Sequence, residues 1–207
     1  MTIRSPRYTA ITGAILAGGK SSRMGKDKAL LEFNGKPFIQ RIAETLQKVF
    51  KNVIIISDHG EDYKFLGLPI YEDVFKNCGP LGGIHSAFVH ATTEMIFVVS
   101  CDLPLFSEET VRCIIEMASP GAVVVSQSAE EIQPLCGLYS RQCFLLLEKH
   151  LHRGRRKVLE FLEDVQSVIV TPKCYQGRNI YRELSNINSP EDYQKLIDLC
   201  FNNLQKT

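Results

Sequence analysis

The sequence has no large excess of charge of either sign. Its 207 residues include 24 basic and 23 acidic side chains, which leaves a net charge of +1 at pH 7. Proteins that bind nucleic acid over a broad surface are usually strongly basic, so we expect no nucleic-acid partner. The positive charge is concentrated instead around residues 20–28 and 153–157.

Long apolar runs are also missing. No stretch approaches the roughly 20 apolar residues that cross a bilayer, and residues 1–7 lack the apolar core of a secretion signal. We expect no membrane partner, and a frayed N-terminal extension over residues 1–9. Linkers and repeats are absent too, and 44% hydrophobic content can build a full core. Residues 1–207 are therefore expected to form a single domain.

Closely spaced cysteine pairs are absent as well. The seven cysteines are an odd number and include no C-x-x-C pair, whereas disulfide frameworks and zinc sites use paired spacings. We therefore expect reduced thiols and a cytoplasmic protein. Cys101 is not expected to act as a nucleophile, because the neighbouring Asp102 should raise the pKa of its thiol.

Two common phosphate-binding motifs are excluded. A Walker A loop needs a glycine five residues before the glycine of G-K-[ST], but Ala14 stands five residues before Gly19. The dinucleotide fingerprint G-x-G-x-x-G is also absent, because Gly18 and Gly19 are adjacent. The chain is therefore neither a P-loop NTPase nor a Rossmann dehydrogenase.

A different glycine-rich segment is present after the apolar run of residues 11–16. Adjacent glycines let backbone N–H groups approach an anion closely. Cations crowd the residues that follow: Lys20, Arg23, Lys26 and Lys28. We interpret this segment as a cradle for a nucleoside triphosphate. A surface turn with solvated lysines is the alternative, which repulsion among the cations disfavours.

Apolar runs alternate with amphipathic stretches along the chain. The runs predicted to be strands are residues 12–17, 53–57, 95–100, 122–126, 135–140 and 167–170. Helical stripes cover residues 39–50 and 111–118, the second capped by Ser107, and Ser189 with Pro190 should open the last helix. The pattern predicts an α/β fold, with a mostly parallel, doubly wound sheet and helices on both faces.

Two further motifs should lie at the carboxyl ends of these strands, where such sheets bind ligands. The glycine-rich segment 79–83 opens a helix and can offer N–H donors to an anion or a base. A plain strand-to-helix turn is its alternative. Asp102 ends a buried strand and offers a hard oxygen ligand for Mg²⁺ on a triphosphate, or else caps a turn.

These segments resemble a known family. Residues 16–30 match its pattern L-A-G-G-x-S-x-R-M-G-x-D-K-A-L, and residues 79–84 (GPLGGI), 101–104 (CDLP), 133–139 (QPLCGLY) and 186–192 (NINSPED) match later segments, with Ser189 where threonine is common. Over residues 12–195 the chain resembles the molybdenum cofactor guanylyltransferases, the MobA family of nucleotidyltransferases. Sugar nucleotidyltransferases share the first motif but usually carry Ala-Ala-Gly where this chain has Ala-Gly-Gly.

The resemblance implies a nucleotide-diphospho-sugar transferase-like fold and a reaction. GMP would pass from GTP to the terminal phosphate of molybdopterin or Mo-molybdopterin, with release of pyrophosphate and with Mg²⁺ as cofactor. The phosphate nucleophile is already anionic near neutrality, so catalysis would rest on positioning and charge neutralisation. Transient contact with molybdenum-insertion and molybdoenzyme-maturation proteins is a further implication.

The resemblance also assigns residues. Arg23, Lys28 and Asp102 are the implied catalytic residues, and Asp102 is the implied metal ligand. The implied nucleotide contacts are Leu16, Ala17, Gly18, Gly19, Lys28, Asp73, Gly82 and Asp102.

One position departs from the family. Where relatives carry an asparagine after the second strand, this chain has Ser57 and Asp58. Either residue could take over the nucleotide contact. Asp58 could accept hydrogen bonds from the N1–H and N2–H₂ groups of guanine, which would favour GTP over ATP.

The implied pterin-binding residues are Arg155, Arg156, Asn186 and Asn188. Cations suit an anionic pterin phosphate and dithiolene. A solvated helix start for the arginines, and turn or cap roles for the asparagines, are equally good alternatives.

Two other functions stay open at this stage. One is a cytidylyl- or uridylyltransferase for another phosphorylated acceptor, which the double glycine disfavours. The other is a non-catalytic GTP-binding regulator. The presence of Lys28 and Asp102 disfavours it, because a binding module does not need a metal-bound triphosphate.

Overall fold

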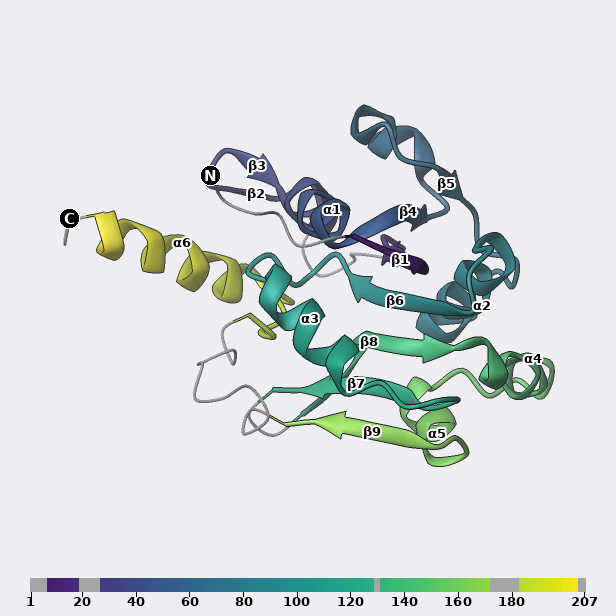
Figure 1. Cartoon of the computed structure of the whole chain (residues 1–207). Helices are drawn as coiled ribbons and strands as arrows, with labels where there is room; N and C mark the ends of the chain where they lie inside the picture. The colour runs from purple at the N-terminus through teal and green to yellow at the C-terminus, as the bar shows by residue number, and fades with distance from the viewer. Residues whose placement is uncertain (1–6, 19–26, 129–130, 172–182, 205–207) are drawn as a thin grey trace.

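A computed structural model describes residues 7–18, 27–128, 131–171 and 183–204 of the chain. Its centre is a seven-stranded sheet with the order β5-β4-β1-β6-β8-β7-β9 (Figure 1). The strands are β1 (Tyr8–Leu16), β4 (Phe50–Ile56), β5 (Ile70–Tyr71), β6 (Met95–Ser100), β7 (Val123–Gln127), β8 (Ile132–Ser140) and β9 (Ser167–Val170). A separate hairpin pairs β2 (Glu32–Phe33) with β3 (Lys36–Pro37).

The sheet is mostly parallel, as the sequence predicts. Strands β5, β4, β1 and β6 run parallel to one another, and β7 is parallel to β9. Strand β8 is antiparallel to both of its neighbours. In this strand Gly137 is required by packing, because a Cβ there would lie 2.6 Å from the Val124 carbonyl oxygen.

Strand β1 begins earlier than the apolar pattern indicates. Tyr8 and Thr9 belong to the strand, so within the described residues the expected extension over residues 1–9 is too long. Tyr8 pairs with Phe50, and a register shift separates this pair from the regular ladder that starts at Thr12.

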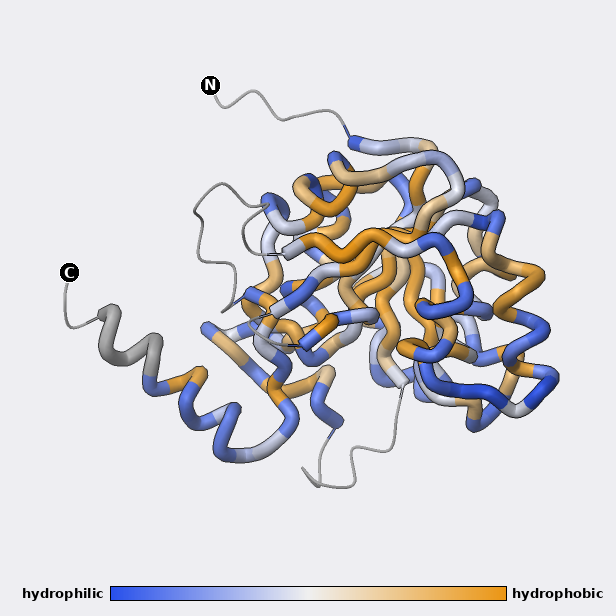
Figure 2. The backbone as a smooth tube through the Cα atoms, turned by 90° about the horizontal axis from the view of Figure 1, so that it is seen from below, coloured by the Kyte–Doolittle hydropathy of each residue, from blue (hydrophilic) through white to orange (hydrophobic). Residues whose placement is uncertain are grey.

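Helices cover both faces of the sheet (Figure 1), and hydrophobic segments lie at the centre of the molecule (Figure 2). Two clusters of buried residues pack between the helices and the sheet, one on each face. One face carries α1 (Phe38–Val49) and α3 (Glu108–Glu116), and the other carries α2 (Gly79–His90), α4 (Phe144–His152) and α5 (Val158–Glu163). The predicted cap of α3 is confirmed, because the Ser107 hydroxyl accepts a hydrogen bond from the Thr110 N–H. The α/β fold class is therefore confirmed, with helices on both faces.

The last helix, α6 (Pro190–Leu204), lies outside these two layers and extends away from the body (Figure 1). Its first turn is capped as predicted, because the Asp192 N–H donates to the Ser189 hydroxyl at 3.1 Å. A small apolar group joins the helix to the β2–β3 hairpin: Phe33, Phe38, Ile187 and Leu196. These contacts fix the segment before α6 next to the carboxyl ends of the parallel strands.

Among the described residues, no helix combines the length and the apolar character that crossing a membrane requires.

Candidate functional site

The carboxyl ends of four parallel strands are level with one another. Leu16 of β1 pairs with Ile56 of β4 and with Ser100 of β6, and Ile56 pairs in turn with Tyr71 of β5. Two residues beyond this row, the chain reaches the glycine turn and three carboxylates that the sequence singles out. These are Gly18, Asp58, Asp73 and Asp102.

Backbone hydrogen bonds keep these four ends together for one residue beyond the strands. The bonds are Ala17 N to Ile56 O (3.0 Å), Ser57 N to Tyr71 O (2.8 Å) and Cys101 N to Leu16 O (3.3 Å). The predicted nucleotide contacts Leu16, Ala17 and Gly18 therefore lie between the ends of β4 and β6. Gly19 and Arg23 lie outside the described residues.

Lys28 stands at the start of a 3₁₀ turn, Lys28–Leu30, and its side chain faces this edge of the sheet. The turn is capped by Asp27, whose Oδ1 accepts a hydrogen bond from the Ala29 N–H at 3.0 Å. The Lys28 ammonium donates to Asn188 Oδ1 at 2.9 Å. Its charge also acts on Asp102, since it favours the ionised form of that carboxyl.

Asp102 is held from two sides. The Ser100 hydroxyl donates a short hydrogen bond to Asp102 Oδ1, and the Asp102 backbone carbonyl accepts from the Ile187 N–H at 2.9 Å. Burial raises the pKa of the Asp102 carboxyl, while the Ser100 hydroxyl and then the Lys28 charge act in the opposite direction. A carboxylate so enclosed is stabilised further when a cation binds it.

The donor set suits a metal that takes most of its ligands from elsewhere. Within the described parts of the chain, no group of three or more His, Cys, Asp or Glu side chains could hold a metal. Mg²⁺ is usually bound by one or two carboxylates, with phosphate oxygens and water as its other ligands. The half-buried Asp102 carboxylate, oriented by Ser100, fits that pattern.

Cys101 has the inert character that the sequence predicts. Burial, followed by the Asp102 charge, raises the pKa of the Cys101 thiol far above its usual range. The thiol therefore stays protonated and is a poor nucleophile.

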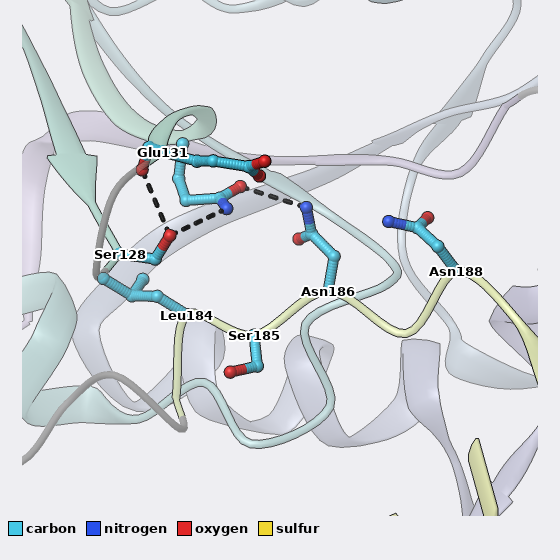
Figure 3. Close-up of a pocket in the computed structure, with 7 residues that line it drawn as sticks. Ser128, Glu131, Leu184, Ser185, Asn186 and Asn188 are labelled. Atoms are coloured by element: carbon cyan, nitrogen blue, oxygen red, sulfur yellow. Dashed lines mark hydrogen bonds between the residues drawn. The ribbon is translucent and has the colours of Figure 1, made fainter. Parts of the chain in front are cut away.

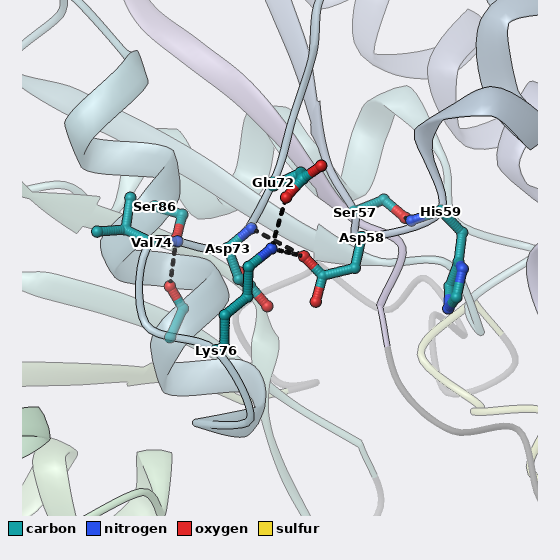
Figure 4. Close-up of polar contacts among 9 residues, drawn as sticks. Ser57, Asp58, His59, Glu72, Asp73, Val74, Lys76 and Ser86 are labelled. Carbon is teal, nitrogen blue, oxygen red and sulfur yellow. Dashed lines mark hydrogen bonds and ion pairs between the residues drawn. The ribbon is translucent and has the colours of Figure 1, made fainter.

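Asp58 is engaged by the protein itself (Figure 4). Its Oδ1 accepts hydrogen bonds from the Lys76 ammonium at 2.6 Å and from the Asp73 N–H at 3.2 Å. Lys76 also pairs with Glu72 at 2.7 Å. The Lys76 hydrogen bond is the main reason that the pKa of Asp58 lies below its usual value. Asp58 and Lys76 together pin the loop that follows β5.

The neighbours of Asp58 have different environments (Figure 4). The Ser57 side chain is buried, and its hydroxyl accepts from the His59 N–H at 3.0 Å, so it caps a local turn. Asp73 has a buried carboxylate oxygen, Oδ1, without a hydrogen-bond partner. Burial, and then the Asp58 charge, raise the pKa of Asp73. The Ser57 hydroxyl already has a hydrogen-bond partner, whereas Asp73 Oδ1 needs a donor from outside the protein.

Gly82 lies within the first turns of α2 and is buried. A Cβ there would lie 3.0 Å from both the Phe75 carbonyl oxygen and the Cys78 Cβ. Its carbonyl accepts from the Ser86 hydroxyl at 2.9 Å, and that hydroxyl accepts from the Val74 N–H at 2.9 Å. Glycine at position 82 thus brings the post-β5 loop close to α2. Its predicted nucleotide contact stays a prediction.

Asn186 and Asn188 line a polar cavity of about 260 Å³ (Figure 3). Ile187, between them in the sequence, donates its N–H to the Asp102 carbonyl, which links this segment to Asp102. Its lining residues are Ser128, Glu131, Gln133, Leu184, Ser185, Asn186 and Asn188. Asn186 Nδ2 donates to Gln133 Oε1 at 3.1 Å, and Asn186 Oδ1 is buried without a partner. The cavity therefore offers a ligand both amide and carboxylate groups.

The two predicted arginines are placed elsewhere. Arg155 and Arg156 are exposed on the loop between α4 and α5, the helices that cover the opposite face from α1 and α3. Arg155 lies 3.6 Å from the Asp164 carboxylate. Neither arginine lines the cavity that Asn186 and Asn188 share, so the structure separates the four predicted pterin residues into two groups.

Three side chains of the site were not singled out from the sequence. Ser100 orients Asp102, Lys76 holds Asp58, and Gln133 holds Asn186. Gln133 belongs to the QPLCGLY segment, so that motif could have indicated it. Ser100 and Lys76 have no such signal, because both are common residue types whose partners depend on how loops meet.

Comparisons with known proteins agree with this geometry. The MobA-like NTP transferase domain matches residues 13–167. A "Probable molybdenum cofactor guanylyltransferase" of Carboxydothermus hydrogenoformans is 37% identical over 91% of this chain and 96% of its own length.

Two crystal structures resemble this fold. An Aquifex aeolicus protein has a TM-score of 0.74 and 35% identity, over 86% of this chain and 93% of its own. Molybdopterin-guanine dinucleotide biosynthesis protein A of Archaeoglobus fulgidus has a TM-score of 0.78 and 23% identity, over 92% of this chain and 99% of its own.

Proposed function

This chain belongs to the MobA-like NTP transferase family, and we propose from that premise that it is a molybdenum cofactor guanylyltransferase. It transfers GMP from GTP to the terminal phosphate of molybdopterin or Mo-molybdopterin. A phosphate oxygen of the acceptor bonds to the α-phosphorus of GTP, and the bond from that phosphorus to the bridging oxygen breaks. The products are the guanine dinucleotide cofactor and pyrophosphate.

One observation supports this two-substrate reaction most strongly. The nucleotide residues and the polar cavity are joined directly, by the Lys28–Asn188 hydrogen bond at 2.9 Å and by the Ile187 N–H to Asp102 carbonyl bond at 2.9 Å. A triphosphate beside Lys28 and Asp102 therefore adjoins an acceptor in the cavity. Such proximity is what a transfer between two bound substrates requires.

The described residues have defined tasks in this proposal. Lys28 neutralises charge on the triphosphate, and Ser100 fixes the orientation of Asp102. Asp73 accepts hydrogen bonds from the nucleotide through its unpartnered oxygen. Asp102 would hold Mg²⁺, which supplies charge neutralisation on the phosphates of GTP and on the departing pyrophosphate.

The acceptor side rests on the cavity. Asn186 Oδ1 is buried without a partner, and Glu131 and Gln133 offer further polar groups to the amide-like edge of a pterin. Arg155 and Arg156 stay proposed contacts for a pterin phosphate or dithiolene, as does Arg23 for the triphosphate. A cytoplasmic location and transient contact with molybdenum-insertion and molybdoenzyme-maturation proteins belong to the same proposal.

The test is pyrophosphate release from GTP and Mg²⁺, with and without molybdopterin, repeated with CTP. Release that requires both GTP and molybdopterin supports the proposal, and Lys28→Met and Asp102→Asn variants should then be inactive. Release with CTP but not with GTP would indicate a cytidylyltransferase. Tight GTP binding without release in any mixture would indicate a regulator.

A further inference from the structure

Tyr63 is a buried side chain to which neither the motifs nor the proposed reaction assigns a role. It lies in the 3₁₀ segment η2 (Gly60–Leu66), which connects β4 to β5, and its side chain is 1% exposed. Its hydroxyl donates a short hydrogen bond to Asp27 Oδ2. Asp27 precedes Lys28 directly, so this contact reaches the nucleotide site from a distant part of the chain.

The two oxygens of Asp27 have different partners. Oδ1 accepts the Ala29 N–H at 3.0 Å and so caps the turn that carries Lys28, while Oδ2 accepts the Tyr63 hydroxyl. Ala29 is fully buried and belongs to the same apolar cluster as Tyr63. The backbone on both sides of Lys28 is therefore fixed, at Asp27 by Tyr63 and at Ala29 by the core.

We propose that Tyr63 is a positioning residue, which holds Lys28 toward the triphosphate through the Asp27 carboxylate. This inference rests on the proposed function, in which Lys28 neutralises triphosphate charge. The phenol fixes the carboxylate, the carboxylate fixes the turn, and the turn directs the ammonium group. Tyr63 itself does not touch the reacting atoms.

The hydroxyl is suited to this task because it stays a donor. Burial, and then the hydrogen bond to Asp27, raise the pKa of Tyr63 far above its usual range. A protonated phenol beside a carboxylate gives a charge-assisted hydrogen bond, which is stronger and more directional than a neutral one. Without the hydroxyl, Asp27 Oδ2 would lose a buried partner and the cap could reorient.

The alternative is a core tyrosine whose hydroxyl simply satisfies its own hydrogen bond. In that role, loss of the hydroxyl would lower stability, and any effect on GTP affinity would not depend on Lys28. A double-mutant cycle between Tyr63→Phe and Lys28→Met distinguishes the two roles. The cycle is measured on the binding of GTP, on the binding of inorganic tripolyphosphate, and on kcat/KM where turnover is present.

Tyr63→Phe should weaken GTP and tripolyphosphate binding roughly tenfold, since a hydrogen bond to a charged group is lost. In the Lys28→Met background the same change should have no further effect. Thr12→Val is the matched control. It removes a buried hydroxyl contact, Thr12 Oγ1 to Thr93 Oγ1 at 2.8 Å, near the opposite ends of the strands, and should leave binding unchanged.

Wild-type binding by Tyr63→Phe, or equal losses with and without Lys28, would overturn the inference. Thermal melts establish that each variant is folded. If Tyr63→Phe does not fold, Asp27→Asn replaces it in the cycle, because it weakens the same contact and keeps the tyrosine ring. Failure of the proposed function would give a different result. The double-mutant cycle would still show coupling between Tyr63 and Lys28 in tripolyphosphate binding, but the wild-type protein would show no turnover.

Discussion

The Lys28 ammonium donates a hydrogen bond of 2.9 Å to Asn188 Oδ1, across 160 residues of sequence. Asn188 is itself fixed, because its N–H donates to the Asp192 carboxylate at 3.1 Å within the cap of α6. The orientation of Lys28 therefore depends on the segment that also lines the polar cavity. This relationship couples the two proposed substrate sites through one side chain.

Replacing Asn188 by alanine should lower kcat/KM for GTP about fivefold, because the Lys28 ammonium loses a partner worth roughly 1 kcal/mol. Steady-state kinetics with varied GTP measures this. Gln194→Ala is the control, since it removes another exposed amide contact of α6, to Asp198 at 2.9 Å. Equal kinetics for Asn188→Ala and Gln194→Ala would contradict the coupling.

Asp102→Asn should abolish turnover and yet raise the melting temperature of the free protein at pH 7. Burial raises the pKa of Asp102, so the folded state holds its proton more tightly than the unfolded chain does. The stability of the wild type therefore falls as the pH rises from the pKa of Asp102 in the unfolded chain to its pKa in the folded protein, and it stays lower above that pH. Thermal melts from pH 3.5 to pH 8 should show the advantage of the Asp102→Asn variant growing through that range. A variant that melts below the wild type at pH 7 would contradict this reasoning.

Asp58→Ala and Lys76→Met should weaken GTP binding to a similar extent. Both changes break the 2.6 Å contact that pins the loop carrying Asp73. Lys64→Met, which removes an exposed ion pair with Glu61 at 2.7 Å, is the control and should not affect binding.

The same variants test whether Asp58 recognises guanine. If it accepts hydrogen bonds from the base, Asp58→Ala should relax the preference for GTP over ATP, and Lys76→Met should retain that preference. Competition binding with GTP and ATP measures both outcomes. Unchanged selectivity in Asp58→Ala would remove guanine recognition by this residue.

His85→Gln should reduce the sensitivity of the protein to acid. His85 is 2% exposed, its ring stacks on Phe144 at 5.0 Å, and its Nε2 lies 3.4 Å from Glu148. Burial lowers the pKa of His85, so the unfolded chain binds its proton more readily. The contribution of neutral His85 to stability is fully present above about pH 6.5. It is lost as the pH falls toward the pKa of His85 in the folded protein.

The measurement is the melting temperature at pH 7.5 and at pH 5.5. The variant should melt lower than the wild type at pH 7.5, because a stacking contact is lost, but the drop between the two pH values should be smaller. An unchanged drop would show that His85 does not titrate with unfolding in this range.

The sequence predicts strands well where burial dictates the pattern. Residues 95–100 and 167–170 form strands with the predicted bounds. Burial explains the first, because five of its six side chains are buried and must be apolar or small. The second is an edge strand in which only Val170 is buried, so its β-branched residues rather than burial explain the match. The direction of β8 was not predicted, since apolar content is the same in both directions. The predicted strands 122–126 and 135–140 left eight residues between them, and that spacing was the available signal, because a parallel crossover needs a dozen or more residues.

The site shows the same division. Gly18, Lys28 and Asp102 were placed from motifs and Asp73 from the family resemblance, and the structure brings these four residues to one edge of the sheet. Ser57 or Asp58 was expected to take over a nucleotide contact, with guanine recognition by Asp58 as a hypothesis that stays open. The structure adds that Asp58 Oδ1 is engaged by Lys76 and the Asp73 N–H. Lys76 lies 18 residues beyond Asp58, on a loop whose path no local pattern specifies.

By itself, the sequence determined the α/β class, because periodicity and turn residues are local properties. Its motifs indicated the family and the segments that meet at the carboxyl ends of the strands. Only the tertiary structure decided which polar side chains pair there. Lys28 meets Asn188, and Asp27 meets Tyr63. Such contacts form between loops, and their geometry depends on strand order, register and helix packing together.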